Sequence, residues 1–596
     1  MKDILEQAEA LLKKYYGYAK FRGGQARVIK SILQGKDTFA IMPTGAGKSI
    51  CFQIPALLFN GVTLVVSPLI SLMKDQVDTL ENLGIPASFI NSSLSLKEVE
   101  RRIEKTAAGE YKILYIAPER LEADSFLEMV KKLEVSFLAI DEAHCVSQWG
   151  HDFRPSYRRV GPFIKKLVSR PVVAAFTATA TEEVQADIIS LLELHHANIY
   201  MTGFDRSNLY FSVYRRVEKK NFILKYIGEN KREAGIIYAA TRKEVENLYD
   251  FLSKKGLAVG KYHAGLNDRE RKFFQEEFLN DNLQIMVATN AFGMGIDKSN
   301  IRYVIHYNLP KNMEAYYQEA GRAGRDGEAS ECILLFSPQD IIIQKYLIEQ
   351  TVYSPARKKS ELDKLQTMAD YVHTSQCLRG FILEYFGEEE FPENCHKCSN
   401  CNDQLEIVDI TEEAEKTFSC IIRMGGSYGV NTVAGVLKGS STKRLRSLGF
   451  DRLSTYGLMK ERTLPEIKDL INQLIAEDYL ALTGGEYPVV KLRSKAVLVL
   501  KEHQKVKGKI VTTTDPEREE DPLFERLRRL RKQIAEREKV PPYIIFPDST
   551  LREMSRRQPL NKEAMLSIKG VGMQKLVKYG DDFMTAIKNY LQDKGE

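Results

Sequence analysis

Nine short apolar runs alternate with segments of helical periodicity between about residue 35 and residue 340. The first five lie at 38–42, 63–67, 113–118, 137–141 and 172–177, and the other four at 235–240, 284–289, 303–308 and 332–337. Apolar runs of this length, separated by helices, predict parallel strands that are covered on both faces. Because about 300 residues exceed the usual size of one such domain, the pattern predicts two α/β domains with a boundary near 203–215.

The pattern becomes helical after residue 340. A helical segment with four cysteines near its end occupies 341–405, and further helices that finish in a hairpin signal occupy 406–505. Residues 506–521 are polar and aperiodic and predict a linker, whereas 522–596 predict a small helical module. Together with α/β domains at 1–205 and 206–340, these segments predict a chain of several domains.

Composition and charge narrow the class of protein. The 596-residue chain has no signal-peptide pattern at its start. Residues 49–73 carry no charge, but two prolines and a glycine interrupt them, so a buried helix and strand are expected in place of a membrane span. We therefore expect a soluble, cytoplasmic protein. The net charge is +6, and residues 522–596 alone hold 16 Lys and Arg against 10 Asp and Glu. A basic module of this kind is typical of proteins that bind nucleic acid, although a solvated helix face has the same composition.

The segment MPTGAGKS at 42–49 lies between a predicted strand and a predicted helix. A glycine loop in this position presents backbone N–H groups and a helix N-terminus to phosphates. We expect it to hold ATP through Thr44, Gly45, Gly47, Lys48 and Ser49. Lys48 would reach the β- and γ-phosphates and Ser49 would ligate Mg²⁺. Met42 stands where the full motif has glycine, but the strand–loop–helix context makes a turn that binds nothing the weaker interpretation.

The predicted strand at 137–141 ends in DEAH, residues 141–144. A carboxylate at the carboxyl end of a parallel strand faces the crevice where ligands bind. We expect Asp141 to hold Mg²⁺ through its ligand shell and Glu142 to orient and deprotonate the attacking water. The four-letter string is weak alone, but its place after a P-loop strengthens the prediction.

The second α/β domain contains YYQEAGRAGRDG at 316–327. Arg322 and Arg325 are three residues apart, so on a helix they would share one face. Arginines that approach the γ-phosphate from a second domain stabilise the charge of the transition state. A solvated basic face is the alternative, and the P-loop in the preceding domain favours the catalytic interpretation.

These segments, with TAT at 177–179 and VATNAFGMGID at 287–297, resemble the ordered motifs of superfamily 2 helicases. AHCVSQWGHDFRPSY at 143–157 and GYAKFRGGQ at 17–25 narrow the resemblance to the RecQ family of DNA helicases, its bacterial members above all, over nearly the whole chain. The resemblance implies two RecA-like motor domains, a zinc-binding helical platform, a winged helix and a small HRDC-like domain. It also implies a catalytic role for Gln318. For adenine it implies stacking on Tyr18, an edge contact from Gln25 and support from Arg22, although many members have proline in place of Gly23.

Trp149 is the only tryptophan in the chain, and it lies in a polar loop. Phe153 and Tyr157 follow it at intervals of four residues, with basic side chains between them. Aromatic rings stack on unpaired bases, and arginines hold phosphates. The DNA-binding candidates in this loop are Trp149, His151, Phe153 and Arg154. The resemblance implies a loop that senses single-stranded DNA and signals to Glu142. The alternative is that Trp149 packs as a local core residue.

Four of the eight cysteines form the pattern C-x17-C-x2-C-x2-C. They are Cys377, Cys395, Cys398 and Cys401. Four thiolates at this spacing satisfy tetrahedral Zn²⁺, and a closed site of this kind is structural. An iron–sulfur cluster is the runner-up. RecQ-like proteins have a zinc platform at this place in the chain.

The C-terminal segments contain candidate contacts to DNA. A capped amphipathic helix from Thr463 and a hairpin at 479–492 predict a winged helix. Lys443 and Arg444 precede it and are candidates for duplex phosphates. Tyr487 at the wing tip fits a strand-separating wedge or an ordinary solvated turn equally well. Lys569, in the glycine-containing turn LSIKGVG, is a candidate for a DNA phosphate, with a simple helix cap as the alternative.

Together these features predict an ATP- and Mg²⁺-dependent DNA helicase that acts on single-stranded and duplex DNA. The resemblance implies 3′→5′ movement, roles in recombination and repair, a single-strand-binding protein as a partner, a monomeric state and association with the nucleoid. An RNA helicase has the same motor, but the winged helix favours duplex DNA. A DNA-binding scaffold with an inactive motor is disfavoured by intact Lys48, Asp141, Glu142 and Arg325. A translocase that separates no strands is the third alternative.

Overall fold

The structure is a computed structural model. It describes the whole chain apart from residues 1, 69, 151, 216, 294–297, 389, 392, 403–404, 484–487, 503, 512–520 and 594–596. His151, Tyr487 and the end of the VATNAFGMGID motif therefore lie outside the described residues. Among the helices that are described, none is both long and apolar enough to cross a bilayer.

The first motor domain is built on a seven-stranded parallel sheet with the strand order β3-β4-β2-β5-β6-β1-β7. Its strands are β1 (Thr38–Ile41), β2 (Val62–Val66), β3 (Ala87–Ile90), β4 (Ile113–Ile116), β5 (Val135–Ile140), β6 (Val172–Thr177) and β7 (Asn198–Met201). Its helical segments are α1 (Lys2–Leu11), η1 (Leu12–Tyr16), α2 (Gln25–Leu33), α3 (Lys48–Leu58), α4 (Ile70–Asn82), α5 (Leu96–Ala107), α6 (Asp124–Val130), α7 (Val160–Lys166) and α8 (Glu182–Leu191). The sheet is covered on both faces: in β2, Leu64 and Val66 enter one core cluster and Val65 enters the other. This two-sided burial explains the continuous apolar runs of the sequence.

The second motor domain has a six-stranded parallel sheet in the order β10-β11-β9-β12-β13-β8. Its strands are β8 (Leu209–Arg215), β9 (Ala234–Tyr238), β10 (Val259–Tyr262), β11 (Ile285–Ala288), β12 (Ile301–His306) and β13 (Ser330–Phe336). Its helices are α9 (Lys219–Glu229), α10 (Arg242–Ser253), α11 (Asp268–Leu279) and α12 (Met313–Ala320). All nine strands predicted from the apolar runs are present in the two sheets.

Helices α13 (Pro338–Thr351), α14 (Pro355–His373) and α15 (Leu378–Tyr385) lead into the cysteine cluster. The next domain holds helices around a separate core and a two-stranded hairpin, which is the predicted winged-helix arrangement. Its elements are α16 (Thr411–Arg423), α17 (Val430–Lys438), α18 (Lys443–Ser447), α19 (Leu464–Ala476), β15 (Leu480–Leu482), β16 (Val490–Leu492) and α20 (Ser494–Glu502). The capping box that starts α19 at Thr463 is formed as the sequence predicts.

The predicted linker at 506–521 is wrong at its start. Residues 507–511 form β17 (Lys507–Val511), which pairs antiparallel with β14 (Leu405–Asp409). A strand whose partner lies about a hundred residues earlier depends on a long-range pairing, which local periodicity does not reveal.

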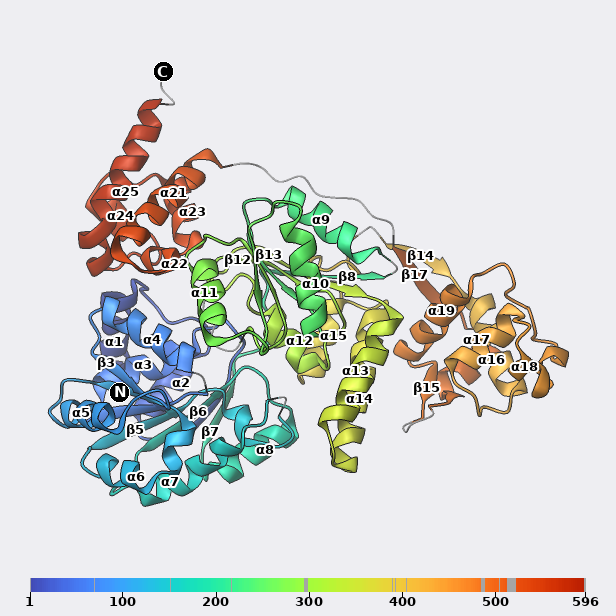
Figure 1. The fold of residues 1–596 in the computed structure, drawn as a ribbon, viewed down its shortest axis with the longest axis horizontal. Helices are drawn as coiled ribbons and strands as arrows, with labels where there is room; N and C mark the ends of the chain where they lie inside the picture. Colours follow the sequence, from blue (N-terminus) through green and yellow to red (C-terminus); the bar gives the residue numbers. More distant parts are fainter. Residues whose placement is uncertain are drawn as a thin grey trace.

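The C-terminal module consists of α21 (Pro522–Glu538), α22 (Pro542–Ile545), α23 (Asp548–Arg557), α24 (Lys562–Leu566) and α25 (Met573–Asp593), packed around their own apolar core. Figure 1 shows these red helices beside α1 and α11 of the motor domains, far from the orange winged-helix domain that precedes them in sequence. The module therefore returns to the motor domains and contacts both.

Candidate active site between the two motor domains

The glycine loop lies between β1 and α3, as predicted. Gly45 and Gly47 have φ angles of +78° and +80°, which L-amino acids with a side chain rarely adopt. Gly47 is also the N-cap residue of α3, and a Cβ there would lie 2.5 Å from the Gln25 amide nitrogen. The loop therefore needs both glycines to place Lys48 and Ser49 on the first turn of the helix.

The acidic residues of DEAH follow β5 directly. The side chain of Asp141 accepts a hydrogen bond of 3.0 Å from the backbone N–H of Glu142, whose φ is +48°. Lys48 Nζ lies 4.0 Å from Glu142 Oε1. Lys48 Nζ, Glu142 Oε2 and Thr44 Oγ1 are buried and have no hydrogen-bond partner among the described residues. Unsatisfied buried polar atoms are costly, so their clustering here fits a site that a polar ligand completes.

His144, the last residue of DEAH, connects this strand end to the TAT segment. Its Nδ1 lies 2.9 Å from Thr177 Oγ1 at the end of β6, and its ring lies 3.4 Å from the Glu142 carboxylate. Burial lowers the pKa of His144 to about 3, so the imidazole is neutral at physiological pH. The contact couples Glu142 to TAT through one neutral ring.

The two arginines reach the site from the second domain, but not on a helix. Helix α12 ends at Ala320, and Gly324 and Gly327 have positive φ angles in the turn that follows. Glycine adopts such left-handed conformations without strain, so these two residues shape the turn beyond the helix end. Arg322 is buried and its Nη1 donates to the Gly293 carbonyl. The prediction of a shared helical face is therefore wrong, although both side chains do line the site.

Arg206 joins the two sides of the site, and motif reading missed it. Its guanidinium donates to the Thr44 carbonyl of the glycine loop and to the carbonyls of Gly321 (3.2 Å), Ala323 (3.0 Å) and Gly324 (2.8 Å). One planar cation thus ties the P-loop to the arginine-bearing turn. Its position at the start of the second domain, in FDRSNL, belongs to none of the phosphate motifs and gives no local signal.

A cavity of about 830 Å³ lies at the centre of this arrangement, which is within the usual range for a small-ligand pocket. Every residue predicted to bind ATP or act in catalysis lines it: Tyr18, Arg22, Gln25, Thr44, Gly45, Gly47, Lys48, Ser49, Asp141, Glu142, Gln318, Arg322 and Arg325. Gln25 donates to the carbonyls of Ala46 and Gly47, and Arg22 Nη1 donates to that of Gly45. The guanidinium of Arg22 also lies 5.9 Å from the centre of the Tyr18 ring. The predicted adenine loop is therefore fastened to the glycine loop.

The aromatic loop after DEAH mixes exposed and core residues. Trp149 is half-buried against the main core, and its carbonyl accepts from Lys364 of α14 at 3.4 Å. Tyr157 is fully buried, and its hydroxyl donates to the Asp141 carbonyl at 2.9 Å. Arg154 pairs with Asp152 and donates to the Pro68 carbonyl, while Phe153 is half-buried. The loop is thus held to the motif at Asp141 by one buried tyrosine, and the Trp149 carbonyl joins it to α14, one of the helices that lead into the cysteine cluster.

The four clustered cysteines come together as predicted. Their sulfur atoms all lie within 4.8 Å of one another. Backbone N–H groups of Gly380, Lys397 and Cys395 donate to the sulfurs of Cys377, Cys395 and Cys401. Such bonds stabilise thiolates, so the set fits a tetrahedral zinc ion. Lys397 and Ser399 also pair through their backbones with Phe211 of β8, which fixes the cluster to the second motor domain.

The remaining DNA-binding candidates lie in different environments. Lys443 and Arg444 are exposed on α18, beside the buried Leu445. Lys569, by contrast, lines the cavity that contains the glycine loop, and its backbone N–H donates to Glu553.

Comparisons with known proteins agree with this architecture. Residues 22–187 match the DEAD/DEAH box helicase model and residues 218–327 match the helicase conserved C-terminal domain. The fold and the site therefore define a two-domain helicase motor of the P-loop type. Residues 338–402 match the RecQ zinc-binding model, 404–517 the RQC domain and 520–587 the HRDC domain.

Full-length relatives narrow the class. A Bacillus subtilis protein named ATP-dependent DNA helicase RecQ is 51% identical over 98% of this chain and 99% of its own length. A Haemophilus influenzae protein of the same name is 39% identical over 99% of this chain and 97% of its own. A mimivirus protein named putative ATP-dependent RNA helicase R290 is 38% identical over 83% of this chain and 92% of its own. The chain belongs to the RecQ family of DNA helicases.

Proposed function

We propose that this protein is an ATP-dependent helicase that separates DNA strands in recombination and repair, with the 3′→5′ polarity that the family implies. The observation that carries the proposal is the cavity between the motor domains, because both domains contribute its polar lining. Hydrolysis of ATP bound in this cavity would change the contacts between the two motor domains. We assign the phosphates to Lys48 and the glycine loop, and the developing charge to Arg322 and Arg325.

Ser49 and Asp141 are the residues to which we assign Mg²⁺, because both line the cavity and hard oxygen ligands suit this ion. Glu142 is the general base. Its carboxylate lies 4.0 Å from Lys48 Nζ and 3.4 Å from the neutral ring of His144. A water between Glu142 and the γ-phosphate would lose its proton to this carboxylate.

Single-stranded DNA is assigned to the loop that contains Trp149, and duplex phosphates to Lys443 and Arg444 on the winged-helix domain. Ordering of the Trp149 loop would act on Asp141 and Glu142 through the short connecting segment and Tyr157. We further propose that the protein acts as a monomer on nucleoid DNA in the cytoplasm, with single-strand-binding protein as a partner.

The test is steady-state ATP hydrolysis with and without single-stranded DNA, for the wild type, Lys48→Ala and Trp149→Ala, beside a DNA-binding titration. We expect strong stimulation in the wild type, no turnover in Lys48→Ala, and DNA binding without stimulation in Trp149→Ala. Stimulation of Trp149→Ala to the wild-type level would make Trp149 a packing residue. Matched RNA strands that stimulate as well as DNA would favour an RNA helicase. A forked-duplex assay with no strand separation would leave only a translocase.

A further inference from the structure

The two motor domains are joined by a short connector, residues 202–208, which runs from the end of β7 to the start of β8. Residues 202–208 are all described, and they form neither helix nor strand. The connector carries Arg206, whose guanidinium spans the glycine loop and the turn that holds Arg322 and Arg325. The position of this side chain therefore depends on the contacts that hold the connector backbone.

The C-terminal end of α15 holds the first part of the connector. The backbone N–H of Phe204 donates to the carboxylate of Glu388, which lies three residues beyond the end of the helix. The buried Phe204 ring stacks on that of Phe386, with the ring centres 4.6 Å apart and an angle of 16° between the planes. The Phe204 carbonyl accepts a hydrogen bond of 2.6 Å from the Tyr317 hydroxyl of α12. Phe204 is thus fixed through its ring and through both of its backbone polar groups.

The N-terminal end of α15 holds the second part of the connector. Arg379, buried in the first turn of this helix, donates to the carbonyl of Arg206 at 3.2 Å and to that of Leu209 at 2.6 Å. Its guanidinium also lies 3.4 Å from the Asp205 carboxylate. Several donors in one rigid plane suit simultaneous contacts of this kind. The backbone at Arg206 is therefore fixed by a buried guanidinium from outside the motor domains.

Both groups of contacts belong to the segment that carries the cysteine cluster. Cys377 is the N-cap residue of α15 and precedes Arg379 by two positions. Lys397, which lies within the C-x2-C-x2-C stretch, donates from Nζ to the Ser207 carbonyl of the connector at 2.8 Å. The cysteines thus gather the two stretches of chain that contact the connector.

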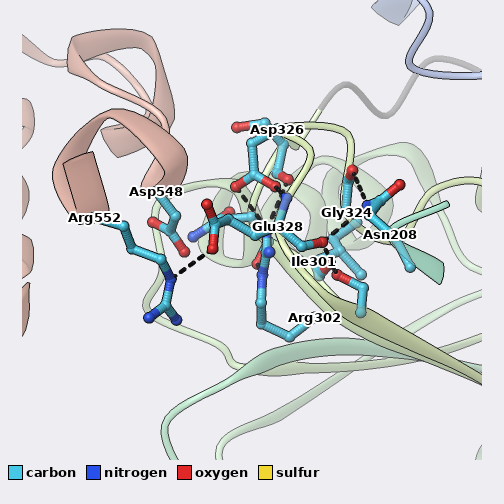
Figure 2. Close-up of polar contacts among 12 residues, drawn as sticks. Asn208, Ile301, Arg302, Gly324, Asp326, Glu328, Asp548 and Arg552 are labelled. Carbon is cyan, nitrogen blue, oxygen red and sulfur yellow. Dashed lines mark hydrogen bonds and ion pairs between the residues drawn. The ribbon is translucent and has the colours of Figure 1, made fainter. Parts of the chain in front are cut away.

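The last residue of the connector, Asn208, contacts the arginine-bearing turn directly. Its side-chain amide donates to the carbonyls of Gly324 at 2.9 Å and Glu328 at 2.8 Å, and Figure 2 shows Asn208 beside Gly324. Arg206 Nε in turn lies 3.3 Å from the side-chain oxygen of Asn208. A shift of the connector would therefore move the Arg206 guanidinium relative to both loops that it joins.

We propose that Glu388 and Arg379 are positioning residues for ATP hydrolysis, which hold the connector so that the Arg206 guanidinium bridges the two motor domains at the nucleotide cavity. Neither side chain is among the described residues that line this cavity, so both act through Arg206. A displacement of about 1 Å caused far from the chemistry can lower a rate by about 100-fold. The proposal rests on the proposed function, since it takes the cavity to be the ATP site.

The test compares Glu388→Ala and Glu388→Gln in the full-length chain, alone and combined with Arg206→Lys. Alanine removes the acceptor of the Phe204 N–H, whereas glutamine keeps a side-chain oxygen in its place. Glu384→Ala, at an exposed position of the same helix, is the matched control. The readouts are kcat and KM for ATP with saturating single-stranded DNA, hydrogen–deuterium exchange of residues 202–208, and zinc content by elemental analysis.

Glu388→Ala should raise exchange at 202–208 and lower kcat about tenfold, because a hydrogen bond to a charged acceptor contributes at least that factor. KM for ATP should change less than about twofold, since the contacts of the glycine loop and the adenine loop remain. Glu388→Gln should lose only about threefold in kcat, because a neutral acceptor keeps about half of the bond energy. Zinc content should stay at the wild-type level in every variant, and Glu384→Ala should match the wild type throughout.

The combination with Arg206→Lys separates a positioning role from a merely structural one. In that background Glu388→Ala should lower kcat less than about twofold further, because the side chain through which Glu388 acts is already lost. A further loss as large as in the wild-type background would overturn the proposal, since the two residues would then act independently. Raised exchange at 202–208 with the wild-type kcat would overturn it as well.

Arg379→Lys gives a second route to the same answer, because it keeps the charge and loses the planar fork. It should raise exchange at 202–208 and lower kcat as Glu388→Ala does. Unchanged exchange in both variants would show that neither residue holds the connector and would overturn the proposal. A wild type that hydrolyses no ATP under any condition would instead refute the proposed function, while exchange at 202–208 would still report whether Glu388 and Arg379 hold the connector.

Discussion

Arg206 offers a direct test of how the two motor domains are held together at the nucleotide site. Its guanidinium donates to one carbonyl of the glycine loop and to three carbonyls of the turn that carries Arg322 and Arg325. The substitution Arg206→Lys keeps the positive charge and most of the side-chain length. It removes the planar fork that makes simultaneous contact with both domains feasible.

The magnitude follows from the hydrogen bonds that lysine cannot make. At least two of the four contacts are lost, and hydrogen bonds from a charged donor contribute about 1.5–3 kcal/mol each. Two lost bonds at the lower figure amount to about 3 kcal/mol. If this energy stabilises the arrangement of the two domains in which ATP is hydrolysed, its loss corresponds to roughly a 100-fold decrease in rate. We therefore expect the DNA-stimulated kcat for ATP to fall about 100-fold.

The assay is steady-state ATP hydrolysis with saturating single-stranded DNA, beside a thermal unfolding curve and a DNA-binding titration. Arg269→Lys, at an exposed position of α11, is the matched control and should leave all three unchanged. DNA binding of Arg206→Lys should stay near the wild-type level because Arg206 contacts the glycine loop and the turn that carries the arginines, and none of the described DNA-binding candidates. A variant that retains more than about a fifth of the wild-type kcat, a loss of only about 1 kcal/mol, would refute the reasoning.

Two further predictions concern His144 and the cysteine cluster. His144 is neutral when folded, with a pKa of about 3 against an ordinary 6.5, so the unfolded chain binds the extra proton and stability falls as pH decreases from 6.5 toward 3. At pH 5.5 protonation of His144 in the unfolded chain should lower the free energy of unfolding by about 1.4 kcal/mol. The drop in Tm from pH 7.5 to pH 5.5 should therefore be smaller in His144→Gln than in the wild type. Equal drops in the two proteins would contradict a buried, neutral His144. Cys398→Ser should lose bound zinc, measured by elemental analysis, and should increase hydrogen exchange in β8, because Lys397 and Ser399 pair with Phe211. Full zinc content with unchanged exchange would show that Cys398 is not a ligand.

The sequence predicted the interior of each motor sheet and missed its margins. The strands that escaped notice, β3, β7, β8 and β10, lie at the four edges of the two sheets. A central strand is buried on both faces and has an apolar run, whereas β7 alternates between half-buried and exposed residues. An edge strand therefore has the composition of a loop or a helix surface, and only its hydrogen-bonded neighbour reveals it.

The candidate site divides in the same way. Motifs gave Lys48, Asp141, Glu142 and the paired arginines because phosphate chemistry needs fixed residue types at fixed local spacing. Arg206 has no such spacing, since its partners are backbone carbonyls of two distant loops that any sequence supplies. The environment of Tyr157 was likewise invisible, because the period that suggested an aromatic surface places it in the core.

The sequence by itself determined the order of the domains, the glycine loop, the acidic strand end and the cysteine set, since each is encoded within a short segment. Only the tertiary structure decided that the arginines lie beyond the end of α12, that β17 returns to β14, and that Lys569 lines the nucleotide cavity. It also decided that the C-terminal module docks on both motor domains. These features depend on contacts between segments far apart in the chain. Burial and complementary charge determine which segments meet, and the local sequence pattern does not predict these partners.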